Sequence, residues 1–476
     1  MKHNVKLNAI LFFLPNVITA FFSIISLPFL TKKLDLADFG YFFLCTIIVN
    51  LFGIFTSFGA SFSMARYFHG RKLKDQRMFL STIFFLSIFS GLLVCLIVYY
   101  FWDSIIAKVL PELFEVKKSN LLIMLFGILI YGCQLYVSEI LTLSKRAFFF
   151  CLYITSQGIV GSVFNILLIT YYDFGVDTLF YSLLASNLVC FLFIILVLSK
   201  YLRYLPNLFY LKKLISEYKI IIANIFENFF FFIERNLISK FLGVEFFAIF
   251  THSKNYEKTL LNINTAISRS VTSIALSDFK KSNTFDYCEK SIEYIVMITF
   301  FFGLFFSTIG YDFISLISNN KFSDASYFVS LWALTLYFKS TNLLYSVIIL
   351  VKGEIKNYSN ITYIEKFSLF PLLLILLPLL GIKALIISYI LSTICLKIYF
   401  FKTANKLFNI PNNEKETLKF FTLSSLCLLI SIYFANTFTL RIILFIFVSF
   451  LGIYIFRKNL LNLINDLQSK LNFKKL

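Results

Sequence analysis

Long apolar segments recur along the whole chain and are separated by short polar connections. About fourteen of them have roughly the 16–25 residues that an α-helix needs to cross the hydrocarbon core of a bilayer. Lipid offers the backbone no hydrogen-bonding partners, so segments this long and this continuously apolar are predicted to be helices. The predicted spans are Ala9–Leu30, Phe39–Ala65, Phe79–Phe101, Leu121–Leu143, Phe148–Tyr171, Leu179–Leu198, Ile220–Leu242, Phe246–Ala275, Tyr294–Tyr311, Tyr327–Val351, Tyr358–Leu380, Ala384–Phe401, Phe420–Thr437 and Ile442–Phe456.

The composition agrees with this pattern. Of the 476 residues, 59% are hydrophobic and 14% are charged. Soluble proteins are about 45–50% apolar and about 25% charged, so this chain has more apolar surface than one soluble core buries. We therefore predict an all-α integral membrane protein with about 14 transmembrane helices. The N-terminus leads into a full-length span without a small-residue cleavage site, so no cleaved signal peptide is predicted.

Lysine and arginine are distributed unevenly between alternate connections. With a cytoplasmic N-terminus, the cytoplasmic side receives most of the cations, including those of RYFHGRKLKDQR, of KYLRYLPNLFYLKKLISEYK and of the basic tail. The opposite connections hold few cations, and YYDFGVD holds acids only. This is the asymmetry of the positive-inside rule, so both termini are predicted to be cytoplasmic. The same asymmetry explains the formal net charge of +19, and no nucleic-acid partner is expected.

Motifs for catalysis or metal binding are missing from the sequence. It contains no P-loop, no GxSxG and no HExxH, and its eight cysteines form no CxxC pair. The three histidines, His3, His69 and His252, lie far apart, so neither a metal nor another cofactor is predicted. A membrane polymerase or ligase of lipid-linked glycans would need a large outer loop, and the longest candidate, WDSIIAKVLPELFEVKKSN, is short. Many helices with short connections indicate a transporter rather than an enzyme.

An internal repeat divides the chain into two halves. Residues Leu30–Phe43 and Ile238–Thr251 align without gaps, and each joins the first and second helices of a six-helix set. Transporters are commonly built from such repeats, with the substrate path between them. The predicted parts are an N-terminal six-helix lobe, a cytoplasmic linker, a C-terminal six-helix lobe, and two extra helices with a basic tail, at residues 1–200, 201–219, 220–406 and 407–476.

Two stretches resemble a known family. LPFLTKKLDLADFGYFFL, followed by FTSFGASFSMARYF, is similar to the opening of bacterial polysaccharide-biosynthesis membrane proteins, the O-antigen flippases of the multidrug/oligosaccharidyl-lipid/polysaccharide exporter superfamily. IERNLISKFLGVEFFAIFTHSKNYEK resembles the start of that family's second lobe, with Glu234 in place of the common aspartate and Phe247-Ala248 in place of Gly-Tyr. The matching signature residues are Pro28, Asp38, Gly40, Tyr41, Gly59, Arg66 and Tyr67. The resemblance implies two six-helix bundles around a central cavity in the bacterial inner membrane.

Four charged residues interrupt the seventh and eighth predicted spans. Glu234 lies eight residues before the end of the seventh span, and Lys254 lies eight residues after the start of the eighth. At about 1.5 Å per residue, the two lie at similar depth on neighbouring antiparallel helices. Arg235 and Glu257 match in depth almost as well. Two interpretations stay open: the four charges pair across the hairpin and hold the two helices together, or they line a substrate path.

Further polar groups favour the second interpretation. Asn255, Lys258, Asn262, Thr265 and Arg269 fall on one face of the eighth predicted helix. A cation at the centre of a bilayer costs about 2.5–3.5 kcal/mol even on lenient scales, so such groups should face protein, water or substrate. The predicted substrate-binding residues are Arg235, Lys254, Lys258, Asn262, Arg269, Lys339 and Lys366; the residues predicted for ion coupling or charge pairing are Glu227, Glu234, Glu257 and Glu365. Of these, Glu365 and Lys366 are expected mainly to neutralise each other.

A cationic cavity suits an anionic passenger. The expected function is a flippase that moves a polyprenyl-pyrophosphate-linked oligosaccharide to the outer leaflet by alternating access, since arginine and lysine bind pyrophosphate well. The expected partners are this substrate, membrane lipids and other membrane proteins of polysaccharide assembly. The alternatives are a cation-coupled drug exporter of the same superfamily, a flippase for a peptidoglycan precursor, and the membrane polymerase or ligase already mentioned.

Overall fold

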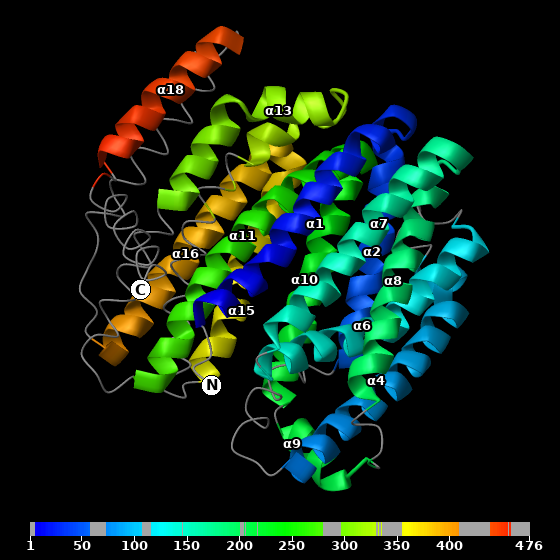
Figure 1. Ribbon diagram of the computed structural model, residues 1–476. Helices are drawn as coiled ribbons and strands as arrows, with labels where there is room; N and C mark the ends of the chain where they lie inside the picture. Colours follow the sequence, from blue (N-terminus) through cyan, green and yellow to red (C-terminus); the bar gives the residue numbers. More distant parts are fainter. Residues whose placement is uncertain are drawn as a thin grey trace, which may run out of the picture. The chain divides into compact units, whose positions relative to one another are not determined.

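The structure is a computed structural model (Figure 1) that describes most of the predicted spans. The described residues are 5–57, 73–106, 116–144, 146–199, 204, 206–216, 218–278, 297–329, 332, 335, 355–408, 438–455 and 457. Within these ranges every regular element is a helix, which confirms the predicted all-α fold class. Eight of the described helices are long and apolar enough to cross a membrane. The total of fourteen stays a prediction, because Phe420–Thr437 and most of Tyr327–Val351 lie outside the described residues.

The helices group into two compact units. The first unit contains Met1–Ala248 and Thr362–Leu385, and the second contains Ile249–Ile361 and Ile386–Leu476. The first holds α1 Val5–Lys33, α2 Leu36–Ser57, α4 Leu73–Phe101, η1 Trp102–Ile106, α6 Lys118–Leu143, α7 Ala147–Leu167, η3 Leu168–Tyr172, α8 Asp177–Leu198, α9 Leu208–Ser216, α10 Tyr218–Leu242 and most of α15 Ile355–Leu380. The second holds most of α11 Val244–Asp278 and α16 Ile382–Phe408, together with α13 Gly310–Ile317 and α18 Phe438–Ile455. This division places α10 with the first unit, so the two predicted six-helix lobes stay a prediction.

The repeat seen in the sequence has a structural counterpart. The first copy turns between α1 and α2 at Leu34 and Asp35, and the second copy turns between α10 and α11 at Gly243, the residue aligned with Asp35. Gly243 has φ +88°, a backbone conformation that glycine adopts without strain. Aligned positions are buried in both copies, as in the pairs Leu30 and Ile238, Thr31 and Ser239, and Phe39 and Phe247.

The two turns also approach each other closely. Helix α10 packs against α2. A Cβ atom added to Gly40, near the start of α2, would lie 2.4 Å from the backbone oxygen of Val244 at the start of α11. At the first turn the Asp35 amide donates a hydrogen bond of 2.9 Å to the Asp38 carboxylate, which caps α2. Gly40 and Asp38, two residues of the family signature, therefore shape this turn and its contact.

The ninth predicted span, Tyr294–Tyr311, corresponds to a helix that bends near its predicted end. The chain bends by 70° between Met297–Thr308 and α13. Gly310 lies at the bend, where an added Cβ would come within 2.9 Å of the Phe306 ring. Arg441 of α18 holds α13 through a hydrogen bond of 2.9 Å to Asp312 and lies 5.0 Å from the centroid of the Tyr311 ring. Hydropathy locates an apolar segment but does not give the angle between the two helices within it, so the bend was not predicted.

A short helix replaces part of the predicted linker 201–219. Tyr210 and Leu214 of α9 are buried in the core that α4, α6, α7 and α8 form. The Tyr210 ring packs edge-on against Phe79 of α4, with 5.6 Å between ring centroids. The backbone amide of Asn207 donates a hydrogen bond of 2.9 Å to the Thr82 hydroxyl. The span pattern could not reveal α9, because nine residues are too few to cross a membrane.

Ion pairs join helix ends on the side predicted to be external. Lys33 at the end of α1 lies 3.2 Å from Asp173, which follows η3. Lys117 lies 2.5 Å from Asp177 at the start of α8. The hydrogen bond and the negative charge of Asp177 raise the pKa of the Lys117 ammonium above its usual value. Asn120 of α6 donates a second hydrogen bond to Asp177, at 2.8 Å, so α6 and α8 are tied together at this end.

Candidate functional site

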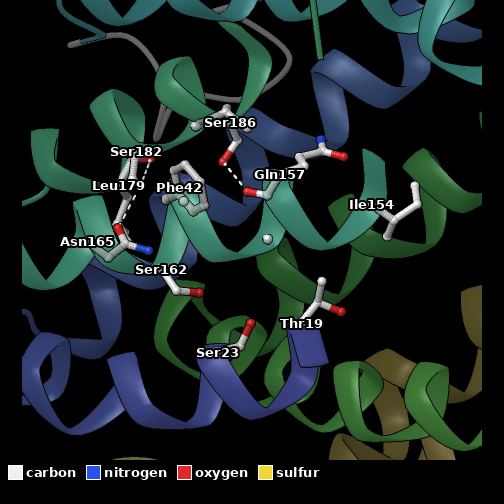
Figure 2. Close-up of a pocket in the computed structure, with 13 residues that line it drawn as sticks. Thr19, Ser23, Phe42, Ile154, Gln157, Ser162, Asn165, Leu179, Ser182 and Ser186 are labelled. Carbon is white, nitrogen blue, oxygen red and sulfur yellow. Dashed lines mark hydrogen bonds between the residues drawn. The ribbon is translucent and has the colours of Figure 1, made fainter. Parts of the chain in front are cut away.

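A pocket of about 350 Å³ opens between four helices of the first unit (Figure 2). Helix α7 provides its centre, because α1 and α8 both pack against α7. The lining consists of hydroxyl, amide and apolar groups from Thr19, Ser23, Phe42, Ile154, Gln157, Gly158, Gly161, Ser162, Asn165, Leu179, Ser182, Leu183 and Ser186. Among the residues that the structure describes here, none that lines the pocket is charged.

Hydrogen bonds and two glycines fix the wall of this pocket. Ser182 donates a hydrogen bond of 2.6 Å to the side-chain oxygen of Asn165, and Ser186 donates one of 3.2 Å to the backbone oxygen of Gln157 (Figure 2). An added Cβ at Gly158 would come within 2.3 Å of Thr19, and one at Gly161 within 2.4 Å of Ser186. The glycines therefore allow α1 and α8 to approach α7.

The chemistry of this pocket is hydrogen bonding without charge. Such a wall can bind a hydroxylated ligand, but it offers no acid to neutralise an organic cation and no base to neutralise a phosphate. These residues are not among the sequence-predicted site residues, because the prediction was based on charged side chains inside the spans. The signal was present: Thr19 and Ser23, and Ser182 and Ser186, are spaced i and i+4, so each pair lies on one face of its helix.

Two of the predicted charges lie together on α10. The side chains of Glu234 and Arg235 are buried, with Arg235 Nε 3.9 Å from Glu234 Oε1. The Arg235 guanidinium also lies 4.6 Å from the centroid of the Phe231 ring, within the range of a cation–π contact. The described contacts of this pair are therefore with each other and with the aromatic ring of Phe231 on the same helix.

Two further predicted charges lie together on α11. Lys254 Nζ lies 2.6 Å from Glu257 Oε2, one helical turn away, and both side chains are almost fully buried. The same ammonium lies 3.1 Å from the centroid of the Trp332 ring and 4.2 Å from that of Tyr389. Lys254 therefore has a partner on its own helix. The predicted pairing of Glu234 with Lys254 and of Arg235 with Glu257 across the hairpin stays a prediction.

The remaining predicted residues have different surroundings. Lys366 Nζ and Glu365 Oε1 of α15 lie 3.9 Å apart, the neighbours expected to neutralise each other. Lys258 of α11 and Glu227 of α10 have exposed side chains. Asn262 and Arg269 belong to α11, but their side chains lie outside the description, and Lys339 lies outside the described residues altogether.

Histidine, cysteine and carboxylate side chains are the usual protein ligands of metal ions. Among the described residues, no group of three or more His, Cys, Asp or Glu side chains is placed to hold a metal ion. His252 lies 4.4 Å from the centroid of the Phe322 ring and forms a hydrogen bond of 3.2 Å with the Tyr256 hydroxyl. Packing inside the second unit therefore accounts for its position.

The sequence matches one family model. The model described as "Polysaccharide biosynthesis protein" matches residues 29–327. That range covers α2, the pocket-lining helices α7 and α8, and the charged helices α10 and α11. No curated protein matches the chain significantly.

Several solved structures share its fold. A lipid II flippase, MurJ, in an inward closed conformation superposes with a TM-score of 0.73 at 15% identity, over 96% of this chain and 100% of that one. A transporter of the MOP superfamily from Pyrococcus furiosus gives 0.67 at 16% identity, over 84% and 94%. An outward-facing multidrug resistance MATE transporter of the same superfamily gives 0.65 at 15% identity, over 86% and 98%. At these identities the likeness shows the fold: a multi-pass membrane protein built like these flippases and transporters.

Proposed function

Since this chain belongs to the family of polysaccharide biosynthesis proteins, we propose that it is a flippase for a lipid-linked oligosaccharide. The passenger is a polyprenyl-pyrophosphate carrying an O-antigen, capsule or exopolysaccharide repeat unit. It crosses from the cytoplasmic to the outer leaflet of the bacterial inner membrane, and both termini of the protein are cytoplasmic. The polyprenyl tail stays in lipid while the polar head crosses through the protein by alternating access.

The uncharged pocket is the observation that carries this proposal. Sugar hydroxyls donate and accept hydrogen bonds, and the pocket presents matching groups from Gln157, Asn165 and Ser182. Its volume of about 350 Å³ lies at the small end of the range for ligand pockets, enough for part of an oligosaccharide. A drug exporter for organic cations would be expected to place a carboxylate here instead.

The pyrophosphate requires cations as well. Lys258 is the predicted cavity cation that the structure shows exposed, and Arg269 lies further along the same helix. Together with Lys339, these residues are proposed to hold the pyrophosphate, because guanidinium and ammonium groups form charge-assisted hydrogen bonds with phosphate oxygens. Lys254 is not assigned this role, because its ammonium is already held by Glu257 and two aromatic rings.

Replacing the two pocket amides tests the sugar contact. The double variant Gln157→Leu with Asn165→Leu keeps side-chain size and removes hydrogen bonding, each lost bond being worth about 0.5–1.5 kcal/mol, or a factor of about 2–10 in transport. The measurement is glycan assembly in cells, with protein levels checked in parallel. The matched control is Gln134→Leu, an amide of α6 that does not line the pocket. Normal glycan output from the double variant at normal protein level would reject the sugar contact.

Replacing the proposed cations tests the class of passenger. A triple alanine variant of Lys258, Arg269 and Lys339 should insert normally and lose delivery of the glycan to the outer leaflet. Unchanged glycan together with a raised sensitivity to cationic drugs would instead support drug export. Drug export is the alternative function because MATE transporters share this fold. Loss of the protein itself would assign these cations a structural role.

A further inference from the structure

The ammonium of Lys254 lies inside a cage of aromatic rings in the second unit. Its Nζ is 3.1 Å from the ring centroid of Trp332, 4.2 Å from that of Tyr389 and 5.6 Å from that of Phe250. All three distances fall within the 6 Å over which a ring face attracts a cation. Glu257 closes the cage with a carboxylate oxygen at 2.6 Å. Rings on several sides and one acid make a recognised arrangement for binding an alkylammonium group.

The cage is built rigidly. Trp332 is 2% exposed and Phe250 is fully buried. The Trp332 indole donates a hydrogen bond of 2.9 Å to the Ser253 hydroxyl, which fixes the plane of the ring. Trp332 and Tyr389 meet edge to face, with ring centroids 4.8 Å apart, so each ring limits the rotation of the other. A cage of fixed rings does not need to be assembled when a cation enters.

We propose that this cage is an alkylammonium-binding site whose resident ligand is the chain's own Lys254. The tether keeps the ammonium at a high effective concentration, so free amines do not compete for the rings in the native protein. The cage therefore keeps organic cations out of this part of the second unit and holds Lys254 away from anions. This inference rests on the contacts of Lys254 and not on the proposed glycan passenger.

Chemical rescue tests the cage. Lys254→Ala keeps Cβ and removes a fragment that corresponds to propylammonium, which leaves a vacant cation site of matching size. Propylammonium chloride should raise the Tm of purified Lys254→Ala by about 2–4 °C in a saturable manner. Sodium chloride at equal ionic strength should not. Wild-type protein and Lys254→Met, in which a side chain fills the cage, should show no saturable rise. No rise in Lys254→Ala, or an equal rise in wild type, would overturn the proposal.

A second measurement applies if Lys254→Ala does not fold. Lys254→Met keeps side-chain bulk but removes the charge, and Tyr389→Leu removes the ring but keeps an apolar side chain. Their single and double variants form a double-mutant cycle for the contact between ammonium and ring. If the two side chains are coupled, the Tm of the double variant should fall by less than the sum of the decreases in the two single variants. Strict additivity would overturn the cage. The matched control, Lys240→Met, changes an exposed lysine of α10 and should be additive with Tyr389→Leu. None of these readouts uses the glycan, so the flippase proposal fails or stands separately.

Discussion

Gly40 lies in tight contact with the second of the two repeated turns, and replacing it with alanine tests that contact. The new Cβ would lie 2.4 Å from the Val244 backbone oxygen and 2.5 Å from Val244 Cγ1. Atoms in ordinary contact are about 3.5–4.0 Å apart, so the structure has to move. The backbone oxygen of Val244 cannot move without its neighbours, so the shift would involve α2 and the start of α11 together.

The size of the effect follows from two opposing contributions. Overpacking of a tight contact costs about 1–3 kcal/mol. Gly40 lies inside α2, and alanine is a better helix former than glycine, so the substitution also stabilises the helix by up to about 1 kcal/mol. Taking the middle of the overpacking range, the expected net loss is about 1–2 kcal/mol. With an unfolding entropy of about 2 cal/mol/K per residue, this loss lowers the Tm of a protein of this size by roughly 1–4 °C.

Thermal unfolding of detergent-purified protein measures this loss. Gly127→Ala in α6 is the matched control, because an added Cβ there would meet only side-chain atoms of Val49 and Asn187, at 3.2 and 3.3 Å. These side chains can move, so the control should change Tm little. Equal Tm values for Gly40→Ala and Gly127→Ala would refute the tight contact between the turns.

Two further predictions concern the second unit and the topology. Arg441→Met should lower Tm by about 2–4 °C, since it removes a partly buried hydrogen-bonded ion pair and a ring contact that hold α18 to α13. The control Lys383→Met replaces an exposed lysine of α16 and should not lower Tm. Equal Tm values for the two variants would show that the ion pair is not stabilising. Reporter fusions after Lys74, Lys213 and Lys281 should read cytoplasmic, and fusions near Asp35, Asp173 and Lys321 should read external. Lys213 and Asp173 on the same side would contradict the topology between them.

Much of the fold could be predicted from hydropathy alone. The end of α10 at Leu242 and of α8 at Leu198 agree with the predicted spans, because a polar residue or a glycine follows each apolar run. The 70° bend before α13 could not be predicted, since hydropathy shows where an apolar segment lies and not the angle between its helices. Helix α9 was not predicted either, because its apolar segment is too short to be recognised as a membrane span.

The candidate site was less predictable than the fold. Glu257 lies one turn after Lys254, so their pair was visible in the sequence, but Trp332 and Tyr389 are distant along the chain. A tertiary cage of this kind needs the fold to bring its rings together. The pocket was overlooked because serine, threonine and amide side chains are common in membrane helices and carry no charge to attract attention.

Lys254 and Lys258 show that a lysine inside a predicted span does not by itself indicate a substrate-binding role. The two lysines are separated by about one turn of α11, and sequence alone gives them the same role. In the structure the Lys254 ammonium is enclosed by Trp332, Tyr389 and Glu257, whereas the Lys258 side chain is exposed. The cost of placing a cation in the membrane is offset inside the protein for Lys254, so no substrate is needed to explain it. An anionic passenger should therefore be sought with variants of Lys258, and a defect in Lys254 variants alone would not be evidence for it.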